Sequence, residues 1–310
     1  MDADDLTPDG PARVARKPLD LALVPRDGMW RDIECVERTG STNTNLVARA
    51  SRGAPEGMVL VAEEQTRGRG RLGRDWVAPA RAGLTFSFLV RPASIPMPRQ
   101  GWLPLMAGVA VAAALGGVIS GDVTLKWPND VMAGGGKLAG VLAEATGDAV
   151  VIGIGLNVST EQDELPPPGP GGLPGTSLRL LGARQLEREP LLTAILLAFE
   201  RRYVAWRKVK GNPAGIRAEY KSMCGTLGRQ VQVERPGGQL LSGEAVDVDS
   251  DGRLVVLTSP AGAVRVGRAV VAVAAGDVVH IRLSGVPGRP CRGAQASAAA
   301  RHATGTAGIR

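Results

Sequence analysis

Histidine is almost missing from this chain. Only His280 and His302 occur among 310 residues, and both lie near the C-terminal end. A histidine-centred catalytic triad needs an imidazole beside its nucleophile, and a HExxH metal site needs two on one helix. The sequence therefore argues against both kinds of site, and any chemistry must run without imidazole.

Cysteine is also scarce. Cys35, Cys224 and Cys291 are odd in number, far apart and without CxxC spacing. The sequence therefore supports neither a disulfide framework nor a thiolate metal site. A protein of the reducing cytoplasm fits this pattern best.

The chain lacks a strong secretory or membrane signal. The short apolar stretch Leu21–Val24 directly follows Asp20, so no secretory hydrophobic region is present, and we expect residues 1–28 to form a flexible leader. The uncharged run of eighteen residues at 103–120 is largely Ala and Gly and contains Pro104. This composition favours a buried helix over a membrane span.

What the chain does have is enough apolar material for a full core. Hydrophobic residues make up 44% of its 310 residues, which is sufficient for one large domain and a small one. The formal charge of +7 indicates anionic partners such as nucleotides, nucleic acids or an acidic protein.

Helices and strands are predicted to mix in the first part of the chain. Ser41 and the Thr and Asn residues after it can cap a helix over 42–51. Strands at 58–62 and 84–90 enclose the charged segment Gln65–Trp76. A helix near 103–119 then precedes a strand over 123–127, which Pro128 ends.

The stretch 137–158 predicts a β-hairpin. The runs KLAGVLAE and AVVIGIGLNV look like two buried strands around the tight turn TGD. Counting outward from Gly147 places Lys137 roughly opposite Asn157, at the open end of the hairpin. Polar residues so placed on an apolar scaffold are typical of a site. The following segment, Glu161–Gly175, is dense in Pro and Gly, which predicts a loop over the surface or beside the site.

The last third predicts a helix, a small β-domain and a tail. A helix over 190–210 carries an apolar stripe interpreted as core packing: Leu192, Ile195, Phe199, Tyr203 and Trp206. From about Arg229, short alternating strands separated by turn signals predict a small β-barrel. Beyond Leu283 no apolar periodicity remains, which predicts a disordered tail. The expected divisions are a leader at 1–28, a catalytic domain at 29–224, the β-domain at 225–283 and a tail at 284–310.

The most unusual segment is QTRGRGRLGRDW at 65–76. Its four arginines alternate with glycines, and with Asp75 they leave a net charge of +3. Glycines let a backbone approach a ligand, and guanidinium groups donate in pairs to phosphate or carboxylate oxygens. The segment alone fits three interpretations equally: a loop that closes over an anionic ligand, a single-strand nucleic-acid contact, or a solvated basic loop.

Two further elements can carry chemistry. KWPND at 126–130 places Asn129 and Asp130 on a Pro-forced turn after a strand, although both could merely hydrogen-bond that turn. Lys137 opens an apolar strand and could equally be a solvated edge residue. Neither element is specific by itself.

The order of five motifs is far more specific. GSTN, EEQTRGRGRLGRDW, KWPND, GGKLAGVLAE and IGIGLNV follow one another between Gly40 and Val158. In this order and spacing the chain resembles the biotin-protein ligases, also called holocarboxylase synthetases, over about residues 35 to 282. The resemblance implies an α/β fold with a mixed, largely antiparallel sheet flanked by helices, as in class II synthetases, and a small SH3-like C-terminal β-barrel.

The resemblance also implies an activity. Members of the family activate biotin with ATP to biotinyl-5′-AMP, release pyrophosphate, and transfer biotin to a lysine of a biotin carboxyl carrier domain, such as that of acetyl-CoA carboxylase. Mg²⁺ on the ATP phosphates is expected, because attack of a carboxylate on a phosphate brings anions together. No nucleic acid or membrane partner is expected, and the protein is expected to be a monomer or a weak homodimer.

By family position, the resemblance implies three sets of site residues. Biotin contacts would come from Ser41, Thr42, Asn43, Gln65, Gly68, Arg69, Gly70, Arg71, Lys137 and Gly140. Contacts to ATP or the adenylate would come from Arg69, Arg71, Trp76, Asn129, Lys137 and Asn157. The catalytic set is Lys137, Arg69 and Asp130, in which Asp130 would either orient the metal or help the acceptor lysine lose its proton.

The reactive adenylate must be shielded from water, so we expect residues 65–75 to be open or disordered without ligand and to close over it. The sequence departs from the family pattern at Arg67, where a small residue commonly stands, and at Leu72. About thirty unpatterned residues precede the catalytic segment, too few for the helix-turn-helix of repressor members, which argues against DNA binding.

Two rivals remain from the sequence. A lipoate-protein ligase shares the fold and chemistry but lacks the GRGRxGR loop and the spacing from KWPND to KLAG. A nucleic-acid-binding module is the other, and an aromatic content of only 3%, with no aromatic interleaved among the loop arginines, gives it little support.

Overall fold

The computed structural model describes residues 15–168, 173–234, 238–258, 269–274 and 277–280. The predicted tail at 284–310 and residues 1–14 of the predicted leader lie outside these ranges. The helices are α1 (Thr42–Ala50), α2 (Trp102–Ala114), α3 (Arg188–Lys208) and α4 (Ala214–Met223), with short 3₁₀ turns η1 (Leu21–Leu23), η2 (Arg71–Gly73), η3 (Met97–Gly101) and η4 (Gln162–Glu164).

The larger part is built on a seven-stranded mixed sheet in the order β1-β2-β3-β7-β6-β5-β4. Its strands are β1 (Asp32–Thr39), β2 (Met58–Gln65), β3 (Gly83–Val90), β4 (Val123–Lys126), β5 (Asp130–Ala133), β6 (Gly136–Thr146) and β7 (Ala149–Asn157). β1 and β2 are parallel and joined through α1, since parallel neighbours need a crossover, and the remaining pairs are antiparallel. The predicted mixed, largely antiparallel sheet is confirmed.

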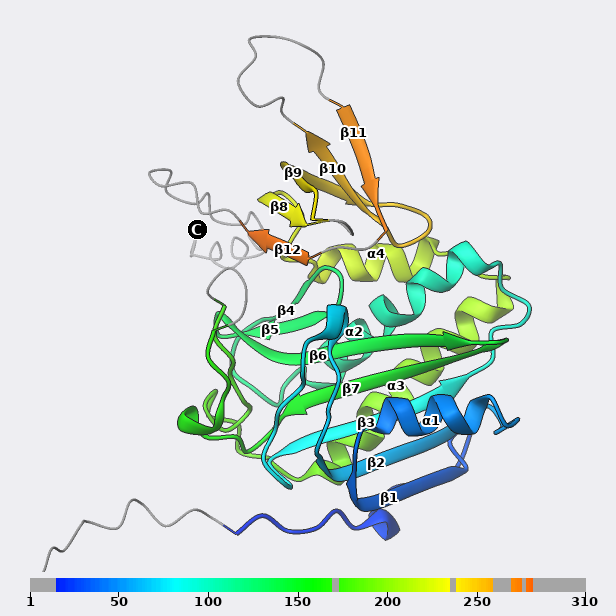
Figure 1. Cartoon of the computed structure of the whole chain (residues 1–310), viewed down its shortest axis with the longest axis vertical. Helices are drawn as coiled ribbons and strands as arrows, with labels where there is room; N and C mark the ends of the chain where they lie inside the picture. Colours follow the sequence, from blue (N-terminus) through cyan, green and yellow to red (C-terminus); the bar gives the residue numbers. More distant parts are fainter. Residues whose placement is uncertain (1–14, 169–172, 235–237, 259–268, 275–276, 281–310) are drawn as a thin grey trace, which may run out of the picture.

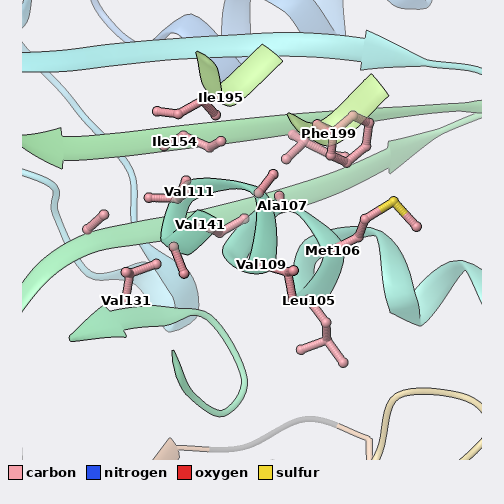
Figure 2. Close-up of a cluster of buried hydrophobic side chains, with 14 of the residues drawn as sticks. Leu105, Met106, Ala107, Val109, Val111, Val131, Val141, Ile154, Ile195 and Phe199 are labelled. Atoms are coloured by element: carbon pink, nitrogen blue, oxygen red, sulfur yellow. The ribbon is translucent and has the colours of Figure 1, made fainter. Parts of the chain in front are cut away.

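Helices cover the two faces of this sheet unequally. In Figure 1, α1 lies on the face toward the viewer, while α2 and α3 lie behind the sheet. Figure 2 shows the apolar layer behind the sheet, where side chains of α2 and α3 meet Val131, Val141 and Ile154. The predicted helical stripe from Leu192 to Trp206 is buried there, which confirms its interpretation as core.

The apolar run at 103–120 is a buried helix, as expected, but α2 ends at Ala114 because the chain turns into the glycine pair at 116–117. Within the residues that the structure describes, no helix is long and apolar enough to cross a membrane.

The smaller part is a five-stranded antiparallel sheet in the order β11-β10-β9-β8-β12, which confirms the predicted small β-domain. Its strands are β8 (Gln230–Glu234), β9 (Leu240–Val248), β10 (Leu254–Thr258), β11 (Ala269–Val273) and β12 (Asp277–His280). Figure 1 shows it stacked beyond α4, at the end of the large sheet that carries β4 and β5.

Indole groups attach the smaller sheet to the larger part. The Trp102 indole N–H donates to the Ser250 carbonyl at 2.9 Å, and the Trp127 indole N–H donates to the Gly252 carbonyl at 3.0 Å. The backbone N–H of Trp127 donates to Oγ1 of Thr226, which is fully buried. Buried polar groups need such partners, so these bonds specify how the two parts dock.

The expected flexible leader is wrong for its described part. Leu19 and Val24 are buried in the main core. The Leu19 N–H donates to Oε1 of Glu63 at 2.5 Å, and Arg188 donates to the Lys17 carbonyl at 2.8 Å. Arg188 and Glu63 form an ion pair with side chains only 7% and 3% exposed. The segment is therefore pinned by groups far away in the sequence.

Candidate active site

A cavity of about 290 Å³ opens on the α1 face of the large sheet. Its floor comes from β3, β6 and β7, where alternate residues face the cavity because strand side chains alternate between faces. On β7 these are Gly153, Gly155 and Asn157, the repeating positions of GIGLN. Added Cβ atoms at Gly153 and Gly155 would each come within 2.2 Å of a neighbouring side chain, so the floor needs glycine.

One end of the cavity is a network of neutral polar groups at the start of α1. Ser41 caps this helix, with its side chain accepting from the Thr44 N–H. Thr42 donates to Oε1 of Gln65 through both its backbone N–H, at 2.7 Å, and its hydroxyl, at 3.0 Å. Ser87 donates to Oδ1 of Asn43 at 2.7 Å. These contacts fix the orientation of the amides beside the cavity.

The same network extends to the basic loop through Glu144 on β6. The Asn43 amide donates to one oxygen of Glu144 at 2.8 Å, and Arg69 pairs with the other at 2.9 Å. Glu144 thus ties the loop to the start of α1. It was not predicted as a site residue, although it lies on the same face of β6 as Gly140 by the alternation of strand residues.

The opposite end of the cavity is a cluster of cations around Asp130. Lys137 Nζ lies 2.7 Å from Oδ1 of Asp130, and Lys126 Nζ lies 3.7 Å from Oδ2. Arg71 donates to Oδ1 of Asn129 at 3.4 Å. Three cations against one carboxylate leave a net charge of +2 in a half-closed site, and such a site favours an anion.

Burial lowers the pKa of Lys126 and that of Arg71 from their ordinary values, because losing water disfavours the charged form, while Asp130 opposes the shift in both. Lys126 is 9% exposed. It was not predicted as a site residue, although it begins the KWPND motif.

The turn that presents this cluster is tighter than predicted. β4 ends at Lys126 and β5 begins at Asp130, so Asp130 pairs with Lys126 within a hairpin rather than leaving the sheet. Trp127 is 1% exposed and belongs to the core. Asn129 exchanges hydrogen bonds with Val141: its side-chain amide donates to the Val141 carbonyl, and the Val141 N–H donates to its carbonyl, both at 2.9 Å.

The basic loop is folded across the cavity, and the expectation that residues 65–75 open or lose order without ligand stays a prediction. The Gly70 N–H donates to the Arg74 carbonyl at 2.7 Å, and the Trp76 N–H donates to the Gly68 carbonyl at 2.9 Å. Leu72 holds the tip with φ 54°, a left-handed conformation that leucine rarely adopts. Internal hydrogen bonds therefore give the loop a defined closed shape.

Trp76 seats this loop on the glycine floor. Its ring lies over Gly155 and Gly140, and Lys137 Nζ lies 5.8 Å from the ring centroid, which is cation–π geometry. The buried indole N–H has no hydrogen-bond partner among the residues that the structure describes. An unpaired buried donor inside a cavity is a natural contact point for a ligand.

The predicted hairpin is confirmed, with Ala139 opposite Leu156. Lys137 and Asn157 share its open end, but Lys137 pairs with Met132 and Gly175 instead of Asn157. Asn157 donates to the Thr176 carbonyl at 2.9 Å and so holds the segment that contacts Lys137.

The cavity brings together all the predicted site residues except Gly68. These are Ser41, Thr42, Asn43, Gln65, Arg69, Gly70, Arg71, Trp76, Asn129, Asp130, Lys137, Gly140 and Asn157. Gly68 instead lies where the two ends of the loop meet, and an added Cβ there would come within 2.2 Å of the Trp76 carbonyl oxygen, so its role is to shape the backbone.

Within the described ranges, no group of three His, Cys, Asp or Glu side chains is placed to hold a metal ion. Asp130, the carboxylate of the cation cluster, already contacts two lysines. Mg²⁺ needs only one or two protein carboxylates when phosphates supply other ligands, so the residues fit a cation carried by a nucleotide better than one held by protein alone.

Comparisons with known proteins agree with this architecture. Residues 35–158 match the model of the biotin/lipoate A/B protein ligase family, and residues 226–280 match the biotin protein ligase C terminal domain. The chain is 43% identical to the biotin--[acetyl-CoA-carboxylase] ligase of Mycobacterium tuberculosis, over 84% of this chain and 93% of that protein. A ligase of the same name from Paracoccus denitrificans is 33% identical, over 73% and 93% of the two chains. The biotin protein ligase from Aquifex aeolicus, solved in complex with biotin and ATP, superposes with a TM-score of 0.65 at 27% identity, over 81% of this chain and 99% of that chain.

Proposed function

Because the chain belongs to the biotin/lipoate A/B protein ligase family, we propose that it is a biotin-protein ligase. It activates biotin with ATP to biotinyl-5′-AMP and transfers biotin to a lysine of a carboxyl carrier domain. One observation carries this proposal: a neutral polar network and a half-buried cation cluster lie at opposite ends of one glycine-floored cavity. Such a cavity suits a ligand with a neutral hydrogen-bonding ring at one end and a carboxylate at the other.

The neutral end would take the ureido ring of biotin. The helix start at Ser41 and Thr42 and the amides of Asn43 and Gln65 offer donors and acceptors without net charge. The apolar side chain of Leu142 lines the same cavity and can pack against the fused ring. A pocket of apolar walls with a few fixed polar groups orients such a ligand.

The cationic end would stabilise the first half-reaction. The biotin carboxylate oxygen attacks the α-phosphorus of ATP, the bond to the pyrophosphate oxygen breaks, and pyrophosphate leaves. Negative charge grows on the α-phosphate oxygens, and Lys137, Arg71 and Lys126 stand where fixed cations lower that barrier. Asp130 holds the two ammonium groups in place through its 2.7 and 3.7 Å contacts. Mg²⁺ bound to the nucleotide would neutralise phosphate charge there.

The second half-reaction needs a deprotonated lysine of the acceptor. Its amine attacks the acyl carbon of biotinyl-5′-AMP, the bond to the phosphate oxygen breaks, and AMP leaves while the amine loses a proton. Asp130, next to this site, remains a candidate to receive that proton or to orient the metal. The folded basic loop and the Trp76 ring would exclude water from the anhydride until the acceptor docks.

We also propose the catalytic domain at 29–224 and the C-terminal domain at 225–283. The acceptor would be a carrier domain of a biotin-dependent carboxylase, with no nucleic-acid partner, and the protein would act in the cytoplasm as a monomer or weak homodimer.

Exchange of labelled pyrophosphate into ATP tests the first half-reaction. We expect exchange that depends on biotin and not on lipoate, and exchange with lipoate alone would reject the proposal. Lys137→Ala should reduce it about 10²- to 10³-fold, the usual effect of removing one group that stabilises developing charge. Lys208→Ala, which removes an exposed lysine of α3, is the matched control and should leave the rate unchanged.

A further inference from the structure

Residues 16–24, here called the N-terminal strap, run along the catalytic part of the molecule. The strap is anchored by burial of Leu19 and Val24 and by the ion pair of Glu63 with Arg188, whose groups bind the strap backbone. These anchors do not involve Arg16. The strap can therefore stay in place when the Arg16 side chain is removed.

Arg16 reaches from the strap to the loop that follows β7. It donates to both carboxylate oxygens of Glu164, at 3.1 and 2.5 Å, and to the Ser159 carbonyl at 3.0 Å. The Glu164 side chain is 5% exposed, and one of its oxygens also accepts the Glu161 N–H at 2.9 Å. Arg16 therefore compensates a nearly buried carboxylate that shapes the turn η4.

This turn begins the pocket lip, defined as residues 161–168. Pro166 and Pro167 of the lip line the active-site cavity. Leu165 lies against Gly175, with its Cδ2 3.1 Å from the place where a Cβ of Gly175 would be. The lip thus touches both the cavity and the segment that holds Lys137.

The contact continues to the backbone of Lys137. The Lys137 N–H donates to the Pro174 carbonyl at 2.8 Å, and the Thr176 N–H donates to the Lys137 carbonyl at 3.0 Å. A continuous series of contacts therefore leads from Arg16 through Glu164 and Leu165 to the strand end that carries Lys137.

We propose that Arg16 is a positioning residue, which braces the pocket lip and through it the backbone of Lys137. Its effect on activity rests on the proposed ligase function, whereas its effect on the lip does not. The inference assigns the N-terminal strap a part in building the ligand site, although no strap residue lines the cavity itself.

Kinetics give the first test. Arg16→Ala should lower kcat/KM for biotin in pyrophosphate exchange about tenfold, or 1.4 kcal/mol. KM should rise because the lip lines the cavity, and kcat should fall because the backbone that carries Lys137 is less well placed. Arg16→Lys keeps the positive charge but cannot contact both oxygens of Glu164 at once, so its kcat/KM should lie between those of the wild type and Arg16→Ala. The control is Arg31→Ala, which removes an exposed arginine that donates to the nearby Gly28 carbonyl and should not alter KM.

Amide hydrogen exchange gives the second test and does not depend on activity. In Arg16→Ala the amides of Glu161, Lys137 and Thr176 should exchange about tenfold faster, while protection of the Leu19 amide persists. Glu164→Gln, which retains an oxygen for the Glu161 N–H, should accelerate the same amides if Arg16→Ala proves too unstable to study.

The combined outcomes are distinct. Faster exchange at these amides together with a raised KM supports the proposal. Unchanged amide exchange overturns it, as does faster exchange with an unchanged KM, which would leave Arg16 a purely structural residue. If the wild type shows no biotin-dependent activity but the amides still respond, the brace stands and the ligase proposal falls.

Discussion

Replacing Gly155 by alanine should shift the basic loop, Gln65–Trp76, from its closed to an open conformation. An alanine Cβ there would lie 2.2 Å from Cε2 and 2.5 Å from Nε1 of the Trp76 ring. Carbon atoms in contact stand about 3.5–4.0 Å apart, so one partner must move by more than about 1 Å. β7 is hydrogen-bonded on both sides, to β3 and β6, and therefore the ring and its loop must give way.

The size of the effect follows from overpacking. Forcing a methyl group into a filled site costs about 1–3 kcal/mol. Here the penalty falls on the closed loop alone, because the open loop leaves the space above Gly155 free. The ratio of closed to open molecules should therefore fall about 5- to 150-fold.

Trypsin measures this ratio directly, since it cleaves after arginine and the loop carries four arginines. Cleavage of a transiently open segment tracks the open population when opening is fast. Without ligand, trypsin should cleave Gly155→Ala within residues 67–74 about 5- to 150-fold faster than the wild type. The control, Gly215→Ala in α4, adds a methyl group where no atom lies within 4 Å. Equal cleavage of the two variants would refute the seating of Trp76 on the glycine floor.

Two further predictions concern stability. Glu63→Gln leaves the buried Arg188 guanidinium without its counter-charge and should lower the free energy of unfolding, measured in urea, by about 3–5 kcal/mol. Glu37→Gln breaks the more exposed pair with Arg81 and should change this free energy by less than about 1 kcal/mol. Similar losses in the two variants would contradict the burial of the Glu63–Arg188 pair. His280 is half-buried, and loss of water together with the nearby charge of Lys126 lowers its pKa to about 4. The unfolded chain therefore takes up a proton at His280 between about pH 6.5 and 4 that the native state does not, so native stability is lost over this range as pH falls. The urea midpoint of His280→Gln should drop less between pH 7 and 5 than that of the wild type, and parallel drops would exclude His280 as the source.

The sequence predicted the hairpin and its polar end because both depend on local patterns. Two apolar runs around TGD fix the pairing, and counting from the turn brings Lys137 and Asn157 to one end. The glycine repeat in GIGLN could also have predicted the cavity floor. Alternate glycines on a strand leave one face of the strand without side chains, and that face of β7 lines the cavity.

What the sequence could not reveal depends on contacts between distant residues. Glu63 and Arg188 are separated by 125 positions, and only their pairing turns the expected flexible leader into a packed strap. The closed loop likewise results from Trp76 fitting above Gly155, which no local pattern encodes. β1, β5 and α4 were missed, and the short β5 illustrates why: its four residues follow a tight turn and need neighbouring strands to be recognised.

The docking of Trp127 has a practical consequence for anyone who divides this protein. Its backbone N–H donates to Thr226 and its indole N–H donates to the Gly252 carbonyl, both in the C-terminal part. Its neighbours in KWPND, Lys126 and Asp130, belong to the cation cluster. A shortened protein that stops before Thr226 would leave both N–H donors of Trp127 without their acceptors, next to the turn that carries Asn129 and Asp130. The small sheet therefore supports the active-site turn, and the two parts should be expressed, purified and engineered together.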